Sequence, residues 1–182
     1  TSSDSAYQFT ANKILISGVT SATTYGMYFT GCDGGENTRG KIAGNTITGL
    51  TGNTGSLYGM YQTASTFNNT VNNVISISNT GATAYGSYYT GGGGVRFHNN
   101  SIQNASASTG TANAAAYFAQ TSGTNPAINI QNNIFSHTGA GNAVYITNLN
   151  FIYSDYNTYY TASAPLFRNT TTVTYATLPL WV

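Results

Sequence analysis

Apolar and polar residues alternate in five related hexapeptides along the chain, and each hexapeptide has a tyrosine at its fourth position. The alternation has a period of two, which predicts half-buried β-strands. The hexapeptides are Tyr25–Thr30, Tyr58–Thr63, Tyr85–Thr90, Ala114–Ala119 and Asn142–Thr147, and their tyrosines Tyr28, Tyr61, Tyr88, Tyr117 and Tyr145 are 33, 27, 29 and 28 residues apart. Repeats of this length predict stacked supersecondary units. The alanine-rich fourth hexapeptide is expected to be a strand like the others.

A second phrase recurs in step with the first: an asparagine followed two residues later by an apolar residue. The asparagines are Asn12, Asn45, Asn73, Asn100 and Asn133, with a degenerate sixth copy at Asn157. Their apolar partners are Ile14, Ile47, Ile75, Ile102 and Phe135. Two phrases per repeat predict two strands per coil. We therefore expect an all-β fold with little or no α-helix, a right-handed parallel β-helix of about six coils.

Stacked coils place equivalent residues above one another. The five asparagines are therefore expected to form a structural ladder, in which side-chain amides bond to the coils on either side. The apolar residues that follow them should form an inward column. The β-helix is predicted to be a single domain over 1–182, and the chain is interpreted as a segment of a longer polypeptide.

The direction of the tyrosines follows less clearly from the pattern. Alternation places Met27 and Phe29 in the core, and Gly26 and Tyr28 on the outer face. The favoured prediction is an outward tyrosine ladder beside a threonine ladder. An inward aromatic stack remains open, because the outward arrangement buries Gln62 and Ser87, which stand at core positions of the later repeats. The tyrosines three residues earlier, Tyr25, Tyr58 and Tyr85, are expected on the other face or at the bend.

Only 5% of the residues are charged and the net charge is +1, so surface polarity comes mainly from neutral hydrogen-bonding groups. The five cations are expected to form no basic stripe, and nucleic acid is not an expected partner. No apolar run approaches the roughly 20 residues that span a bilayer, so membrane insertion is not expected.

Candidate chemistry is sparse. Asp33 and Glu36 share a glycine-rich loop with Arg39 and Lys41 nearby, and the favoured interpretation is a local salt-bridged turn. His98 and His137 are 39 residues apart without a recurring acid or cysteine, and both are expected to be ordinary surface histidines. The sequence predicts no catalytic residue, no metal site and no cofactor.

Several phrases carry a family resemblance: Asn132–Phe135, Asn142–Thr147, Ser154–Tyr160 and the closing Thr177–Trp181. They resemble right-handed parallel β-helix repeat regions of very large secreted bacterial surface proteins. That resemblance implies an extracellular or cell-surface location and a noncatalytic structural or adhesive role in a fibre or adhesin.

The alternative hypothesis is a carbohydrate-binding or polysaccharide-degrading β-helix module. The expected partners are glycans or other surface polymers, together with self-association through coil ends or lateral faces. The tyrosine ladder is the candidate surface for recognition or assembly, against the plainer hypothesis that it only supports the fold.

Overall fold

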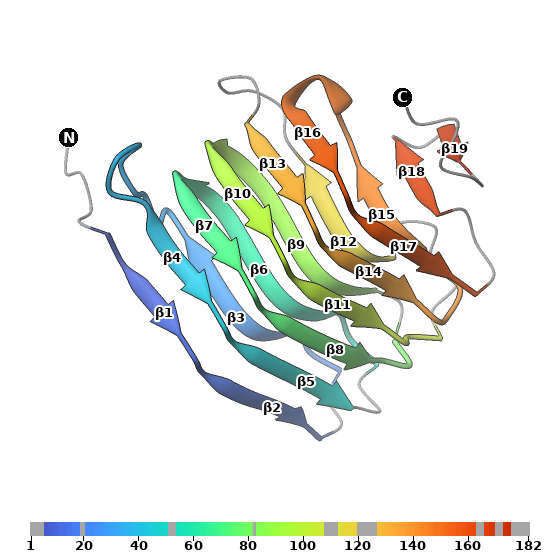
Figure 1. Ribbon diagram of the computed structural model, residues 1–182. Helices are drawn as coiled ribbons and strands as arrows, with labels where there is room; N and C mark the ends of the chain where they lie inside the picture. Colours follow the sequence, from blue (N-terminus) through green and yellow to red (C-terminus); the bar gives the residue numbers. More distant parts are fainter. Residues whose placement is uncertain are drawn as a thin grey trace.

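The computed structural model describes residues 6–18, 21–50, 54–81, 83–107, 113–119, 127–162, 166–169 and 173–175. Over these ranges the chain winds into a right-handed parallel β-helix of six coils with three strands each (Figure 1). The described part contains no α-helix, only the 3-10 turn η1 (Leu149–Phe151). The predicted fold class is confirmed. The C-terminal phrase of the resemblance, Thr177–Trp181, lies outside the described residues.

The strands fall into three sheets, one for each side of the coil. Sheet A contains β1 (Gln8–Thr10), β4 (Gly40–Ala43), β7 (Asn68–Val71), β10 (Val95–His98), β13 (Ile128–Gln131) and β16 (Ile152–Asp155). Sheet B contains β2 (Lys13–Ser17), β5 (Thr46–Leu50), β8 (Val74–Ser78), β11 (Ser101–Asn104), β14 (Ile134–His137) and β17 (Thr158–Thr161). Sheet C contains β3 (Thr24–Thr30), β6 (Leu57–Thr66), β9 (Ala84–Gly93), β12 (Ala114–Ala119), β15 (Asn142–Ile146), β18 (Phe167–Asn169) and β19 (Val173–Tyr175).

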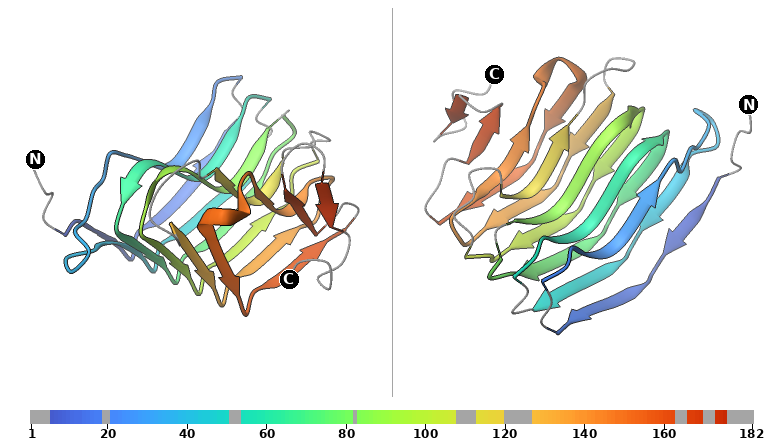
Figure 2. Two further views of the ribbon diagram at one scale, coloured as in Figure 1. Left: turned by 90° about the horizontal axis from the view of Figure 1, so that it is seen from above. Right: turned by 180° about the vertical axis from the view of Figure 1, so that it is seen from behind.

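Every pairing between successive coils is parallel, and the views in Figure 2 show the strands stacked along one axis. The exception is β19, which pairs with β18 in the antiparallel direction at the C-terminal end of sheet C. The expectation of two strands per coil was wrong, because sheet A adds a third. Its strands are only three or four residues long and directly precede the asparagine phrase, so in the sequence they look like part of the connection. Val95–His98 carries the signal that was missed: apolar residues alternate with polar ones before the turn at Asn99.

The core lies inside the coil, between the three sheets. The predicted inward column pairs in register, Ile14 with Ile47, then Ile75, Ile102 and Phe135. All are fully buried except Ile14, which packs against the core from the first coil. Stacking like on like therefore gives a continuous apolar interior.

A polar residue enters this core without remaining unpaired. Gln62 is fully buried, and its Nε2 donates to Thr70 Oγ1 at 3.2 Å across the interior. The burial of a glutamine therefore does not oppose an outward direction for the tyrosines, because its amide bonds to a neighbouring strand.

The turn between sheets A and B has the same backbone conformation in all six coils. A residue with positive φ stands directly before each ladder asparagine: Ala11, Gly44, Asn72, Asn99, Asn132 and Tyr156, with φ from 55° to 65°. Glycine and asparagine tolerate this left-handed region best, and they fill four of the six positions. The turn directs the next side chain back into the corner of the coil.

The asparagines form a hydrogen-bonded stack at that corner. Asn73 Oδ1 accepts from the backbone N of Asn45 at 3.1 Å and from its Nδ2 at 2.9 Å. Asn73 Nδ2 donates to Asn100 Oδ1 at 2.9 Å and to the carbonyl of Ile42 at 3.0 Å. The side chain thereby uses its whole capacity for hydrogen bonds, as a buried amide should. The same ladder links Asn12 to Asn45 at one end and Asn133 to Asn157 at the other.

Candidate functional site

The tyrosines form two neighbouring columns on the outer side of sheet C. One column contains Tyr28, Tyr61, Tyr88, Tyr117 and Tyr145, which pair in register from β3 to β15. The other contains Tyr25, Tyr58 and Tyr85, and continues with the small Ala114 in β12. Five of these tyrosines form a cluster with Ala114 that is separate from the main core, and ring contacts join the other three to it. We call these eight tyrosines the tyrosine array.

The expected place of the second column was wrong because strict alternation breaks at a glycine. Register pairing skips Gly26, and a Cβ added there would lie 2.7 Å from Ile47 Cγ2 in the core. The glycine position thus faces inward rather than beside Tyr28, where the sequence pattern placed it. Two successive inward residues, Gly26 and Met27, then separate two outward tyrosines. A three-residue interval therefore places Tyr25 and Tyr28 on the same face.

The rings of the array are packed against one another. Tyr28 and Tyr61 stack with centroids 5.2 Å apart and planes 3° apart, and Tyr61 and Tyr88 stack at 4.9 Å and 4°. The two columns meet edge to face, as in the pair of Tyr58 and Tyr61 at 5.2 Å and 88°. Both arrangements are favourable for aromatic quadrupoles. Ring faces inside the column are therefore occupied by neighbouring rings, and ring edges and hydroxyls are what remain for solvent.

Burial increases along the array from the N-terminal coil toward the fifth coil. Tyr28 is 52% exposed and Tyr25 is 39% exposed, whereas Tyr85 and Tyr145 are only 6% and 7% exposed. Burial raises the pKa of the Tyr58 hydroxyl to about 12, and neighbouring tyrosines add to the shift. It also raises the pKa of Tyr85 and Tyr88 above the ordinary tyrosine range. The array is neutral at physiological pH.

The two ends of the array differ. At the C-terminal end the Arg168 guanidinium lies over the ring of Tyr145, 5.5 Å from its centroid, a cation–π contact. At the N-terminal end Tyr28 borders a hollow of about 370 Å³ in the first coil. Its lining includes Phe9, Ile14, Met27 and Phe29. The exposed aromatic surface of the array thus lies at this end, at Tyr25 and Tyr28, rather than along the column, where the ring faces are stacked.

The loop with Asp33 and Glu36 is organised differently from the expected salt-bridged turn. Asp33 Oδ1 accepts from the backbone N of Thr66 at 2.9 Å and from its hydroxyl at 2.8 Å. Arg39 donates to the carbonyl of Gly94 and lies over the Phe67 ring. Asp33 and Arg39 thus hold the loop against later coils.

The two histidines also differ from expectation, because only one lies at the surface. His98 is half-buried, and its Nε2 lies 3.1 Å from Asn129 Oδ1. His137 is fully buried, and its Nδ1 accepts from the backbone N of Gly139 at 3.1 Å and of Gly141 at 3.2 Å. Burial lowers the pKa of His137 to about 4, so the imidazole is neutral and structural.

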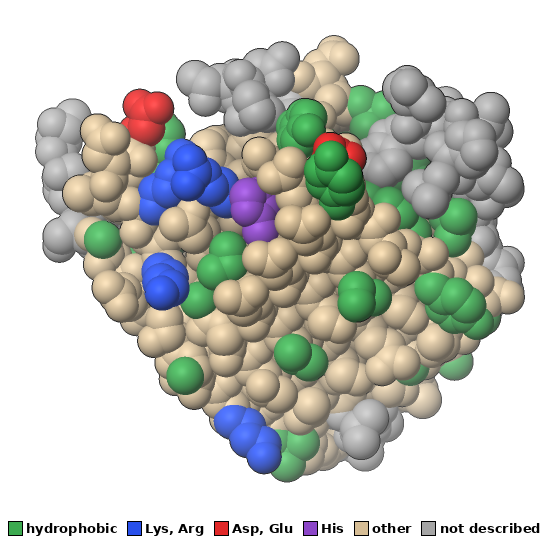
Figure 3. Space-filling view, viewed as in Figure 1, with side chains coloured by type: hydrophobic (Ala, Val, Ile, Leu, Met, Phe, Trp, Pro, Cys, Tyr) green, Lys and Arg blue, Asp and Glu red, His purple; other side chains and the backbone are tan. Residues whose placement is uncertain are grey.

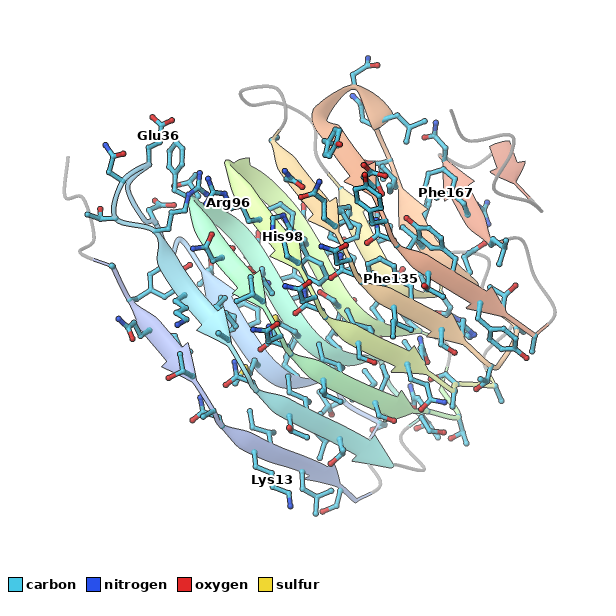
Figure 4. The ribbon with its side chains drawn as sticks, in the orientation of Figure 1. Lys13, Glu36, Arg96, His98, Phe135 and Phe167 are labelled. Atoms are coloured by element: carbon cyan, nitrogen blue, oxygen red, sulfur yellow. The ribbon has the colours of Figure 1, made fainter. Side chains whose placement is uncertain are left out.

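Cations gather on sheet A although the sequence suggested none would. Lys41 on β4 and Arg96 on β10 are exposed and share one register column, in which Asn69 stands between them. Figure 3 shows basic side chains beside a histidine on this face, and Figure 4 shows Arg96 near His98 and Lys13 apart from them on β2. Sequence separation hid this cluster, since Lys41 and Arg96 are brought together only by the coil register.

The described residues offer little for metal or redox chemistry. Among them, no group of three or more His, Cys, Asp and Glu side chains is arranged to hold a metal ion. Within the same ranges, no helix has the length and hydropathy needed to cross a membrane. Comparisons with protein-family models, with curated proteins and with solved structures found no match to this chain.

Proposed function

We propose that the chain is a noncatalytic structural β-helix of an extracellular fibre or adhesin. The observation that carries this proposal is the asparagine stack, which runs through all six coils. Each asparagine inside the stack is hydrogen-bonded to the asparagines of both neighbouring coils. Such a stack makes a stiff rod whose length depends on the number of coils. The low charge and the neutral outer columns suit a rod that meets neighbours through many weak contacts.

The titratable groups support a noncatalytic role. Asp33 is engaged with Thr66, and His137 is buried with both bonds to its Nδ1 made by backbone groups. Glycoside hydrolysis needs two carboxyl groups that flank the scissile bond. Glu36 is exposed on the Asp33 loop, whereas Asp155 lies on β16 in the sixth coil. Asp4 lies outside the described residues.

The direct test is polysaccharide turnover. The purified chain, incubated with pectate, xylan and other surface polymers, should release no reducing ends or unsaturated products. Cleavage that disappears in Asp33→Asn or Glu36→Gln would overturn the noncatalytic proposal. Location is tested separately by antibody labelling of intact cells that express the natural protein, where the chain should be accessible without permeabilisation.

Self-association through the N-terminal coil end belongs to the same proposal. Phe9 and Tyr28 are exposed beside the hollow of the first coil, and this apolar surface suits contact with a second copy. Sedimentation at increasing concentration should show association that weakens in Phe9→Lys and not in Val74→Lys, an exposed residue of sheet B. A monodisperse monomer at high concentration would count against this mode of assembly.

The alternative function is carbohydrate binding, favoured by the aromatic faces of Tyr25 and Tyr28 at the end of the array. A glycan array that compares Tyr28→Ala with Tyr117→Ala separates the possibilities. Ligand binding lost only in Tyr28→Ala supports an end-on sugar site. Binding unchanged in both variants excludes the tyrosine array as the site.

A further inference from the structure

The exposed cations of sheet A stand in one line along the helix axis. The register column runs from Lys41 through Asn69 and Arg96 to Asn129, one residue from each successive strand. Lys41 and Arg96 are two strands apart, about 9.6 Å at the usual strand spacing. Uncharged amides occupy the strand between them and the strand after them. We call these four residues the cationic strip.

A further cation, Arg39, lies beside the strip, and His98 stands in the next column. The Arg39 guanidinium is held at the start of β10 by its bond to the carbonyl of Gly94, two residues before Arg96. Burial lowers the pKa of Arg39, the positive charge of Arg96 lowers it further, and the carboxylate of Glu36 opposes the shift. His98 lies in the adjacent column, next to Gln131. Three of the five cations of the chain therefore gather around β4 and β10.

The acidic groups near the strip leave its centre uncompensated. Asp33 faces Thr66, and Asp155 accepts from Tyr153 at 3.1 Å and from the backbone of Tyr156 at 2.9 Å. Glu36 is exposed on the loop beyond β4, and Figure 4 places it at the margin of the cluster around Arg96. An anion on the strip would relieve repulsion between Arg39 and Arg96.

We propose that the cationic strip on the outer face of sheet A binds an acidic polysaccharide whose sugars carry carboxylates. Lys41 and Arg96 would each meet a carboxylate, and the Nδ2 groups of Asn69 and Asn129 would donate to hydroxyls of the sugars between them, because Asn69 Oδ1 is buried and Asn129 Oδ1 is paired with His98. The proposal adds a ligand to the adhesive function proposed above and rests on it only for the extracellular setting.

A nucleic acid fits this face less well than a glycan does. Duplex DNA carries a charge about every 1.7 Å along its axis, and its binding requires many clustered Lys and Arg. The strip presents two exposed cations separated by neutral amides, which suits a polymer of lower charge density that is rich in hydroxyl groups. The Nδ2 groups of Asn69 and Asn129 can donate to such hydroxyls.

The experiment measures binding of polygalacturonate, with neutral dextran as the uncharged polymer. The wild-type chain should bind polygalacturonate at low salt and lose this binding at about 1 M salt, because the screening length there is only about 3 Å. The double variant Lys41→Gln, Arg96→Gln should weaken binding roughly tenfold, the loss of two exposed charge contacts. Dextran should not bind.

Lys13→Gln is the matched control, because Lys13 is exposed on sheet B and its loss changes the net charge in the same direction. Circular dichroism should show that all variants are folded, since Lys41 and Arg96 are exposed. The conservative variant Lys41→Arg keeps the positive charge and should retain binding. Equal losses in Lys13→Gln and the double variant, or no binding at all, overturn the strip as a site. Tighter binding of a single-stranded oligonucleotide than of polygalacturonate also overturns it. These outcomes are independent of the polysaccharide turnover assay, which tests the noncatalytic proposal.

Discussion

At the scale of single residues, the turn before each ladder asparagine imposes one backbone conformation that not every residue accepts equally. Tyr156 adopts φ 55° there, although its side chain is 76% exposed and packs little. The left-handed region costs a non-glycine residue roughly 1 kcal/mol. The equivalent positions of three other coils hold asparagine: Asn72, Asn99 and Asn132.

Tyr156→Asn is therefore expected to stabilise the protein by roughly 0.5–1 kcal/mol, measured by urea unfolding. Tyr160→Asn is the control, since Tyr160 is similarly exposed but lies within β17. It should give no gain. A Tyr156 variant no more stable than wild type would show that the turn carries no strain.

His137 makes stability depend on acid. Its pKa is lowered from 6.5 to about 4 in the folded chain by burial, so the unfolded chain binds the proton more readily. Its contribution is complete above pH 6.5 and is lost as pH falls through 4, to a total of about 3 kcal/mol. His137→Asn should flatten this slope, because Asn104 in the preceding coil accepts from the backbone of Ser106 in the same manner. An acid slope that persists unchanged in His137→Asn would assign it to other groups.

At the scale of elements, the asparagine stack is the strongest constraint on how coils join. Asn73→Asp would place a carboxylate oxygen against the carbonyl of Ile42 and Asn100 Oδ1, where Nδ2 now donates. We expect a loss of roughly 3–5 kcal/mol at neutral pH. Asn12→Asp at the exposed first coil should cost less than about 1 kcal/mol, because solvent reaches it. Equal costs at both positions would contradict a cooperative stack.

The same elements show what the sequence predicts and what it hides. The asparagine and tyrosine phrases predicted strands of sheets B and C, because like residues must stack when coils repeat. Sheet A was missed, since its short strands differ in composition from coil to coil: Gly40–Ala43 and Ile128–Gln131 share little. The break in alternation at Gly26 is also hidden, because the sequence pattern does not show that Gly26 and Met27 both face inward. The sequence also hides the cluster of Lys41 and Arg96, because these residues meet only through the register of sheet A.

At the scale of the whole molecule, the free energy of unfolding should change little with pH across the neutral range. It should fall in acid and in alkali, because of one kind of group in each case. With 5% charged residues, few pairs exist for salt or pH to disturb. The acid boundary belongs to His137, and the alkaline boundary belongs to Tyr58, Tyr85 and Tyr88 of the array, whose pKa values are raised by burial.

The alkaline boundary follows from the direction of the tyrosine shifts. Burial raises the pKa of Tyr58 from 10.0 to about 12, so the folded chain keeps a proton that the unfolded chain releases. This contribution is complete below pH 10 and is lost as pH rises through 12. Unfolding midpoints measured from pH 7 to 12 should fall only above about 10. Tyr58→Phe should lessen the fall, because it removes the ionisable hydroxyl and keeps the ring. A decline that begins near pH 8 would assign the alkaline boundary to groups outside the array.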